Sequence, residues 1–232
     1  MSRVRTTMPA SLFTGQIQPT DATPRPLLPW PAIHVYTVYM PPEPTTTRIA
    51  TEARKLLDAE GVDAVTMRRV ASAVGITAMA VYRHYPDRDG LLNALADDGF
   101  TELAARLATA RLKGDLTTRL RKVLDVNLDF ALESPRLFEL MFLRHRRGAR
   151  KFPVDFAVGK SPTANQFAEL MAEGIRTGVF QDIDIWEIAF ESGALIQGLV
   201  MLYLGDRIDA TPTEFRRIVH RAMERYLNGI RK

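Results

Sequence analysis

The amino-acid sequence predicts an all-α protein. From residue 45 onward, apolar residues recur at the spacing of a helix face, and glycines and prolines divide the chain into separate segments. Neither the alternation typical of a strand nor a long internal repeat is convincing. With 232 residues, 46% of them hydrophobic and 25% charged, the chain is long enough for one or two soluble domains.

Residues 1–44 differ from the rest in their proline content. Nine of the 14 prolines lie in this segment, where they remove backbone donors and fix φ, so we expect a mostly unstructured extension. There are two alternatives: a short strand over 33–39 that docks on the rest of the protein, or a translation start at Met40. The apolar stretch 27–40 is broken by prolines and is too short to span a bilayer.

The next segment predicts two short helices joined by a tight turn. A first helix covers about 46–60, and a second runs from about Thr66, its N-cap, to Val74. Gly75 permits the positive φ of a reversal, and Thr77 caps a short third helix. This spacing is that of a helix-turn-helix, whose second helix stands out from the surface and fits the major groove of DNA.

Residues 66–92 also resemble the tetracycline-repressor (TetR) family. The matching positions are Thr66-Met67-Arg68, Ala71, Val74-Gly75-Ile76-Thr77, Tyr82-Arg83-His84-Tyr85, Arg88 and Leu91. The resemblance covers about 45–95 and implies a DNA-binding domain there, with its helix-turn-helix at about 66–85. It further implies that 96–232 form a larger helical effector-binding and dimerisation domain of a transcriptional regulator, more often a repressor.

Ten residues are candidates for DNA contact, mostly by this resemblance. They are Thr66, Arg68, Thr77, Ala78, Met79, Ala80, Tyr82, Arg83, His84 and Arg88. Tyr82, His84 and Arg88 are expected near phosphates, where donors fix register. Arg68 is preferred to Arg69, which lies about 100° away on the same helix. Each has a structural alternative, such as a plain cap for Thr77 or a surface pair with Asp89 for Arg88.

The short helix departs from the family pattern at Ala78, Met79 and Ala80. Small side chains there let the backbone approach closely and offer methyl groups to thymine. We therefore expect operator preference to depend more on Arg68, Arg83 and DNA shape. The formal charge of +4 is only mildly basic, so nucleic-acid binding depends on this local site and on its duplication in a dimer.

Six further helices are expected after the helix-turn-helix. Their ranges are about 87–110, 115–133, 135–144, 162–177, 184–204 and 212–228. Ser134, Ser161 and Thr211 each precede a proline, and each is expected to cap the helix that follows.

The segment 184–204 is apolar nearly all round, so it must be covered on two sides. Its charge-free part, 192–205, is shorter than the roughly 20 residues needed to cross a membrane. The resemblance implies that 184–204 and 212–228 form the interface of a homodimer on pseudo-palindromic DNA, with no membrane partner.

A cavity for a small, largely apolar effector is implied by the same resemblance. Its candidate lining is Phe130, Phe138, Met141, Phe142, Phe167, Met171, Trp186, Phe190, Gln197 and Met201. Plain core packing is the alternative for each apolar member. Gln197 is polar in an apolar helix, so it orients a ligand or bonds across the dimer.

The run 144–151 holds five Arg and Lys residues plus His145. We expect a solvated loop after a helix end, where positive charge is favourable; anion binding is the alternative.

The sequence gives no support for catalysis. It has no cysteine, only four scattered histidines and no phosphate-binding, nucleophile-elbow or metal-binding motif. We expect no enzyme activity, no cofactor and no metal, and the absence of cysteine suits a cytoplasmic protein. The alternative function is a helical dimeric interaction protein without sequence-specific DNA binding.

Overall fold

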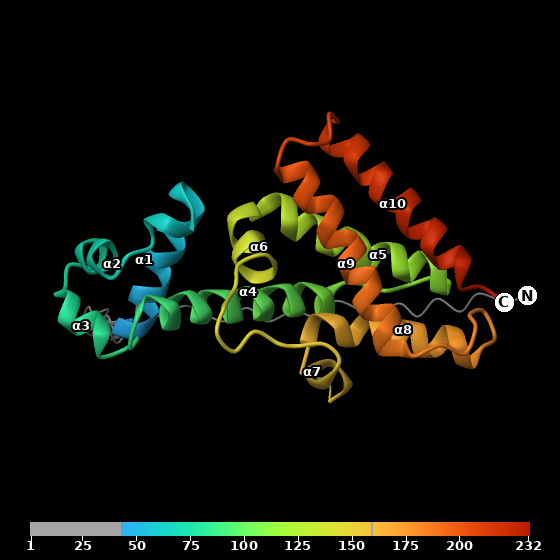
Figure 1. The fold of residues 1–232 in the computed structure, drawn as a ribbon, viewed down its shortest axis with the longest axis horizontal. Coiled ribbons are helices and arrows are strands. Elements are labelled where there is room, and N and C mark those ends of the chain that lie inside the picture. Colours follow the sequence, from blue (N-terminus) through green and yellow to red (C-terminus); the bar gives the residue numbers. More distant parts are fainter. Residues whose placement is uncertain (1–42, 159) are drawn as a thin grey trace, which may run out of the picture. The chain divides into compact units, whose positions relative to one another are not determined.

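The computed structural model describes residues 43–158 and 160–232, and these residues form helices joined by turns (Figure 1). The elements are α1 (Thr45–Glu60), the 3-10 turn η1 (Val62–Ala64), α2 (Met67–Val74), α3 (Ala78–Tyr82), α4 (Arg88–Thr109), α5 (Leu116–Glu133), α6 (Pro135–Phe142), α7 (Val154–Ala157), α8 (Pro162–Arg176), α9 (Ile185–Leu204) and α10 (Pro212–Gly229). The described residues contain no β-strand and only an isolated bridge, so the all-α prediction is confirmed. The expectations for residues 1–42 lie outside the described part.

The first three helices share a small apolar core. Ile49 and Leu57 of α1 are buried, as are Val70 of α2 and Val81 of α3. Thr66 accepts a hydrogen bond from the backbone N–H of Arg69, so it caps α2 as its sequence predicts. Because this core is small, only a few inward-pointing side chains hold α2 and α3 in place.

Three prolines begin helices where the sequence predicts, but only one of the preceding hydroxyls caps its helix. Thr211 has an extended backbone, with ψ 160°, and forms a capping box with Glu214. Ser134 and Ser161, with ψ of 59° and 89°, make no cap bond. The expectation was wrong at these two serines because their backbone departs from the extended conformation that aims a side chain at the helix N-terminus.

Helix α4 belongs to both parts of the fold. It contacts α1, and it also contacts α5, α6 and α8. Leu91 and Leu95 are buried in its first half, and Leu103 and Leu107 in its second. Any displacement of α4 by the larger helical part therefore reaches the helix-turn-helix.

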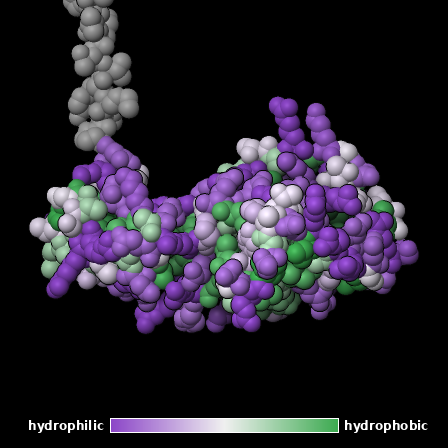
Figure 2. All heavy atoms as spheres, turned by 90° about the horizontal axis from the view of Figure 1, so that it is seen from above, coloured by the Kyte–Doolittle hydropathy of each residue, from purple (hydrophilic) through white to green (hydrophobic). Residues whose placement is uncertain are grey.

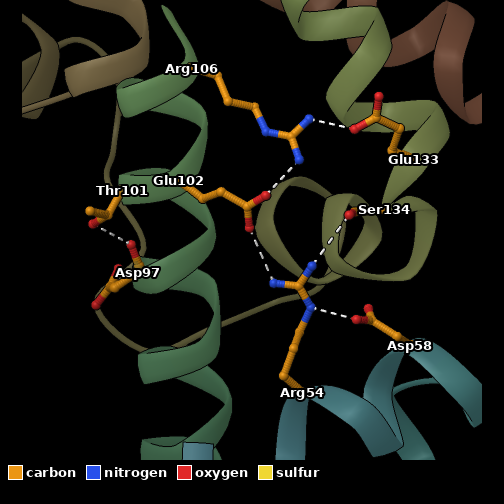
Figure 3. A network of polar contacts seen from close by, with 8 residues as sticks. All are labelled: Arg54, Asp58, Asp97, Thr101, Glu102, Arg106, Glu133 and Ser134. Carbon is orange, nitrogen blue, oxygen red and sulfur yellow. Dashed lines mark hydrogen bonds and ion pairs between the residues drawn. The ribbon is translucent and has the colours of Figure 1, made fainter. Parts of the chain in front are cut away.

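A network of polar contacts joins α1 to α4, α5 and α6 (Figure 3). Arg54 donates to Glu102 at 3.4 Å and to the hydroxyl of Ser134 at 3.3 Å. Arg106 donates to Glu102 at 2.7 Å and to Glu133 at 2.6 Å. The two guanidinium groups share one carboxylate, so the network fixes α1 against the larger helical part.

The larger part buries aromatic side chains between α5, α8, α9 and α10. Phe130, Phe180 and Phe215 are fully buried, and the ring of Tyr203 stacks on that of Phe215 at 4.1 Å between centroids. Gly174 on α8 allows a close approach, since a Cβ there would collide with the Phe180 ring. Figure 2 shows hydrophobic residues gathered in patches on the surface, with hydrophilic residues around them.

Candidate functional site

The turn between α2 and α3 has the geometry that its glycine predicts. Gly75 is in the left-handed region, with φ 77° and ψ 35°. The N–H of Ile76 donates to the carbonyl of Ala71 at 3.0 Å, which closes the end of α2. Thr77 then accepts from the N–H of Ala80 at 3.2 Å and begins α3. The two helices are thereby held in a helix-turn-helix.

Helix α3 points one side into the core and the other into solvent. Val81 is completely buried, whereas 67% of Met79 and 46% of Tyr82 is exposed. Of the ten residues predicted to contact DNA, Arg68, Thr77, Met79, Tyr82, Arg83 and His84 are exposed, and Thr66, Ala78, Ala80 and Arg88 are partly buried. The outward side of α3 is therefore open to a large partner.

The two adjacent arginines of α2 have different surroundings. Arg69 donates to both carboxylate oxygens of Glu60, at 2.9 Å and 2.5 Å, and this pairing holds the pKa of Glu60 below its usual value. Arg68 is exposed and makes no ion pair with any residue that the structure describes. Of the two, Arg68 is the cation available to a partner.

His84 lies just after α3 and contacts α1. Its Nδ1 is 2.8 Å from the hydroxyl of Thr46. When that hydroxyl donates, the proton of the imidazole resides on Nε2, at the other edge of the ring. Thr46 thus orients His84, a contact that its sequence position alone does not reveal.

Arg88 is tied to its own domain. Its Nε donates to the carbonyl of Val65 at 2.7 Å and its Nη2 to the carbonyl of Val62 at 2.6 Å, while Asp63 lies 3.8 Å away. These bonds attach the start of α4 to the first residue of η1 and to the residue that follows η1. The Arg88 side chain therefore helps to position α4. The sequence suggested only a phosphate contact or a surface pair with Asp89.

The larger helical part contains an open cavity of about 340 Å³, lined by residues of α4 to α10 and of the loop before α7. Six of the ten predicted ligand residues line it, namely Phe138, Met141, Phe142, Phe167, Phe190 and Gln197. Its volume is at the lower end of ligand pockets, which span roughly 300 to 1,000 Å³.

Four of the predicted ligand residues do not line the cavity. Phe130 and Met171 are fully buried in the core, and the guanidinium of Arg106 lies 5.3 Å from the centroid of the Phe130 ring. Trp186 is half-buried near the start of α9, and Met201 is 53% exposed. Because α9 is apolar all round, its sequence does not show which residues face inward.

One end of the cavity is aromatic. Phe190 of α9 stacks on Phe152 with 4.3 Å between ring centroids, and Phe156 meets Phe190 edge to face at 5.9 Å. On α6, the ring centroids of Phe138 and Phe142 lie 4.6 Å apart. Phe152 and Phe156 come from a short segment that the helical periodicity did not predict.

The basic run 144–151 is in part the solvated loop that its composition suggested: Arg144, His145, Arg147 and Lys151 are exposed, whereas Arg146 and Arg150 are partly buried. Arg144, Arg146 and Arg150 line the cavity. Arg146 is half-buried, and this burial lowers the pKa of its guanidinium. The guanidinium of Arg150 lies over the ring of Phe100, 4.9 Å from its centroid. The run follows directly on α6, whose aromatic residues also line the cavity. This closeness in the sequence was the one indication that the basic residues could lie beside the cavity.

Within the described ranges, no group of three or more His, Asp or Glu residues is placed to hold a metal ion. By length and composition alone, α9 passes as a membrane-crossing helix. The core helix of a soluble bundle passes the same test, and α9 contacts both α8 and α10. Its exposed apolar residues are Phe190, Met201, Leu202 and Leu204.

Comparison with known proteins identifies the first part of the chain. Residues 49–95 match the family described as bacterial regulatory proteins, tetR family. The nucleoid occlusion factor SlmA of Pasteurella multocida is 31% identical over 83 residues, which are 35% of this chain and 41% of SlmA. The HTH-type transcriptional repressor DrrR1 of Streptomyces coeruleorubidus is 40% identical over 58 residues, 24% of this chain and 22% of DrrR1. The chain thus spans less than half the length of these relatives.

Solved structures extend the likeness to the larger helical part. A protein of unknown function from Rhodococcus sp. RHA1 is 25% identical with a TM-score of 0.68, over 82% of this chain and 97% of that protein. Structures described as TetR family regulators have TM-scores of 0.56–0.60 at 16–22% identity. This chain therefore carries the characteristic domain of the tetR family of bacterial regulatory proteins at residues 49–95, within the overall fold of TetR family regulators.

Proposed function

We propose that this protein is a DNA-binding transcriptional regulator that acts in the cytoplasm as a homodimer on a pseudo-palindromic operator. A small, largely apolar effector, bound between the helices of residues 96–232, releases it from DNA. We also propose that 45–95 act as the DNA-binding domain. The observation that carries the proposal is the exposed side of α3, with Val81 buried beneath it and Tyr82 and Arg83 facing solvent.

The donors around α3 suit a duplex. Tyr82, Arg83 and His84 are exposed in succession, and Arg68 is exposed nearby on α2. A phenol, an imidazole and guanidinium groups are donors that phosphates accept, and arginine also reads guanine in the major groove. Because the helix itself carries Ala78, Met79 and Ala80, its backbone approaches the base edges closely.

The exposed residues of α9 support a dimer. Met201, Leu202 and Leu204 are large apolar residues in contact with solvent, next to the amphipathic α10. Apolar surface of this kind is stable in water when a second copy covers it, and a two-fold axis then presents two α3 helices to one duplex. The two recognition helices would enter successive major grooves about 34 Å apart.

The test is a titration of fluorescent duplexes that tile the DNA upstream of the protein's own gene. We expect one duplex to bind at least about a thousandfold more tightly than a scrambled duplex, with affinity that falls steeply as salt increases. Arg68→Ala should weaken that complex, whereas Arg69→Ala, whose parent side chain is already paired with Glu60, should not. Equal affinity for all duplexes would overturn the proposal and favour a helical dimeric interaction protein.

A further inference from the structure

The cavity in the larger helical part is lined by cations as well as by aromatic rings. Arg144, Arg146 and Arg150 contribute the positive charge, and none of the described residues that line the cavity is Asp or Glu. The remaining polar lining is neutral and includes Asn127, Ser192 and Gln197. A cavity built for a purely apolar molecule does not need these cations, because bringing cations toward an apolar space is unfavourable.

The carboxylates nearest to the basic run are already engaged. Glu139 accepts from Arg144 at 3.0 Å. Asp155 accepts from the backbone N–H of Lys151 at 2.8 Å and from Nζ of Lys160 at 3.2 Å. Asp155 is still close enough to Arg150 for a Coulombic attraction, yet Arg150 makes no hydrogen bond to a carboxylate among the described residues. Arg150 also lines the cavity, so its charge has no paired carboxylate there.

The half-buried guanidinium of Arg146 has few hydrogen bonds, and those it has are long. It donates to Oδ1 of Asn93 at 3.4 Å and to the carbonyl of Met141 at 3.3 Å, both near the long limit of a hydrogen bond. Its Nε is buried and has no partner in the described part of the chain. Burial lowers the pKa of this guanidinium, Asp97 raises it, and the charge of Arg150 lowers it again. An anion placed between the two arginines would relieve both the desolvation and the repulsion.

A buried hydroxyl also lines the same cavity. Ser192 is almost completely buried, and its Oγ has no hydrogen-bond partner within the described ranges. The phenol of Tyr226 is near enough to interact with it but donates its own proton to Glu191 at 2.6 Å. Even where its own proton is shared with the phenol of Tyr226, the Oγ of Ser192 can still accept a hydrogen bond from a polar atom on the body of a ligand.

From this arrangement we infer that the cavity binds a small organic acid, whose carboxylate is held by Arg146 and Arg150 and whose aromatic or alkyl body lies among Phe138, Phe167 and Phe190. The inference rests on the proposed function, because it names the chemical class of the effector. Arginine holds carboxylates with paired, charge-assisted hydrogen bonds. The stacked rings of Phe152 and Phe190 offer an apolar surface to the rest of the molecule.

The test compares acids with the alcohols of the same carbon skeleton. The probes are 4-phenylbutyrate, octanoate and decanoate, each paired with its alcohol and titrated calorimetrically into the full chain at neutral pH. We expect at least one acid to bind with a Kd about tenfold or more below that of its alcohol. Equal affinities of acid and alcohol, or no acid with a Kd below about 1 mM, overturn the inference.

Two variants of the basic run locate the carboxylate. Arg150→Gln should bring the acid and its alcohol to nearly equal affinity. Arg147→Gln removes the same charge from an exposed position that does not line the cavity, so it should leave the preference for the acid intact. Loss of the preference in both variants, or in neither, overturns the assignment to Arg150. Circular dichroism confirms that each variant folds.

Duplex binding without any ligand separates this inference from the proposed function. If the protein prefers no duplex, the proposed function fails, while the ratio of acid to alcohol affinity still decides the chemistry of the cavity. If the protein binds a duplex and the alcohols bind or release it as well as the acids, the organic-acid inference alone fails.

Discussion

The helix-turn-helix and the larger helical part place charged and apolar side chains in opposite ways. In α2 and α3 the apolar residues Val70 and Val81 are buried, and cations such as Arg83 face solvent. On α9 the apolar residues Met201 and Leu202 face solvent, and in the loop after α6 Arg146 lines a cavity. The two regions are therefore suited to different partners.

The difference has a physical consequence for how each surface binds. Exposed cations release counterions from a bound polyanion, and this release favours binding less as the salt concentration rises. Exposed apolar residues bind by excluding water, so the strength of that contact depends little on salt and strongly on buried area. Salt should therefore separate duplex binding from dimer formation in one protein.

The largest expected effect comes from placing charge on the exposed face of α9. The double variant Met201→Glu/Leu202→Glu should weaken the dimer by about 3 kcal/mol or more, because two carboxylates would have to be desolvated in the interface. Sedimentation at a series of concentrations measures the change, and duplex affinity should fall with it. Val154→Glu alters an exposed apolar residue outside α9 and serves as the control. A double variant that remains a dimer at all these concentrations would assign the interface elsewhere.

The second effect concerns Arg88, whose guanidinium bonds two carbonyls of the preceding turn. Arg88→Ala should lower the free energy of unfolding by about 1 to 2 kcal/mol, since it leaves these acceptors without their charged donor. Urea unfolding gives this value, and duplex titration gives the affinity. The earlier expectation of a phosphate contact predicts in addition that all duplexes lose affinity about equally.

Arg88→Lys separates the two roles of this side chain. Lysine keeps the positive charge but lacks the planar fork that reaches both carbonyls. If affinity for DNA is restored while stability is not, Arg88 contacts phosphate as well as its own domain. If the lysine variant restores neither, the contribution of Arg88 is the attachment of α4 to η1.

The helix-turn-helix is the part of the molecule that its sequence describes best, because its determinants are local. Thr66 and Thr77 cap their helices, and Gly75 has the positive φ that its position predicts. Each of these features depends on residues within four positions along the chain. The exposed sides of α2 and α3 follow directly from the helical period once Val70 and Val81 are assigned to the core.

The cavity was only partly predictable, since its walls come from segments far apart in the sequence. The amphipathic α6 supplied Phe138 and Met141, whose inward direction its period predicts. Met201 was misplaced because α9 has no polar face to fix its rotation. Arg146 and Arg150 were missed because composition describes a loop as solvated, whereas packing against Phe100 decides where these side chains lie.

A smaller effect is expected at Tyr82, whose exposed phenol is proposed to donate to a phosphate. Tyr82→Phe removes one neutral hydrogen bond and should lower affinity by about three- to tenfold. Since a phosphate contact carries no sequence information, the loss should be the same for the operator and for a scrambled duplex. A loss confined to the operator would instead place the phenol on a base edge.

The smallest expected effect is at Arg69, and it tests whether exposure alone makes an arginine part of the DNA-binding surface. Arg69 and Arg68 are both exposed, but both terminal nitrogens of Arg69 are bonded to Glu60. Exposed ion pairs contribute little to stability, so Arg69→Ala should change neither the urea midpoint nor duplex affinity measurably.

The matched Glu60→Gln variant releases the Arg69 guanidinium without removing it. If Glu60→Gln tightens duplex binding and Arg69→Ala then abolishes the gain, the ion pair keeps a potential DNA contact out of use. If Arg69→Ala by itself weakens binding as much as Arg68→Ala, the pair opens on DNA, and pairing in the free protein does not decide which arginines contact the duplex.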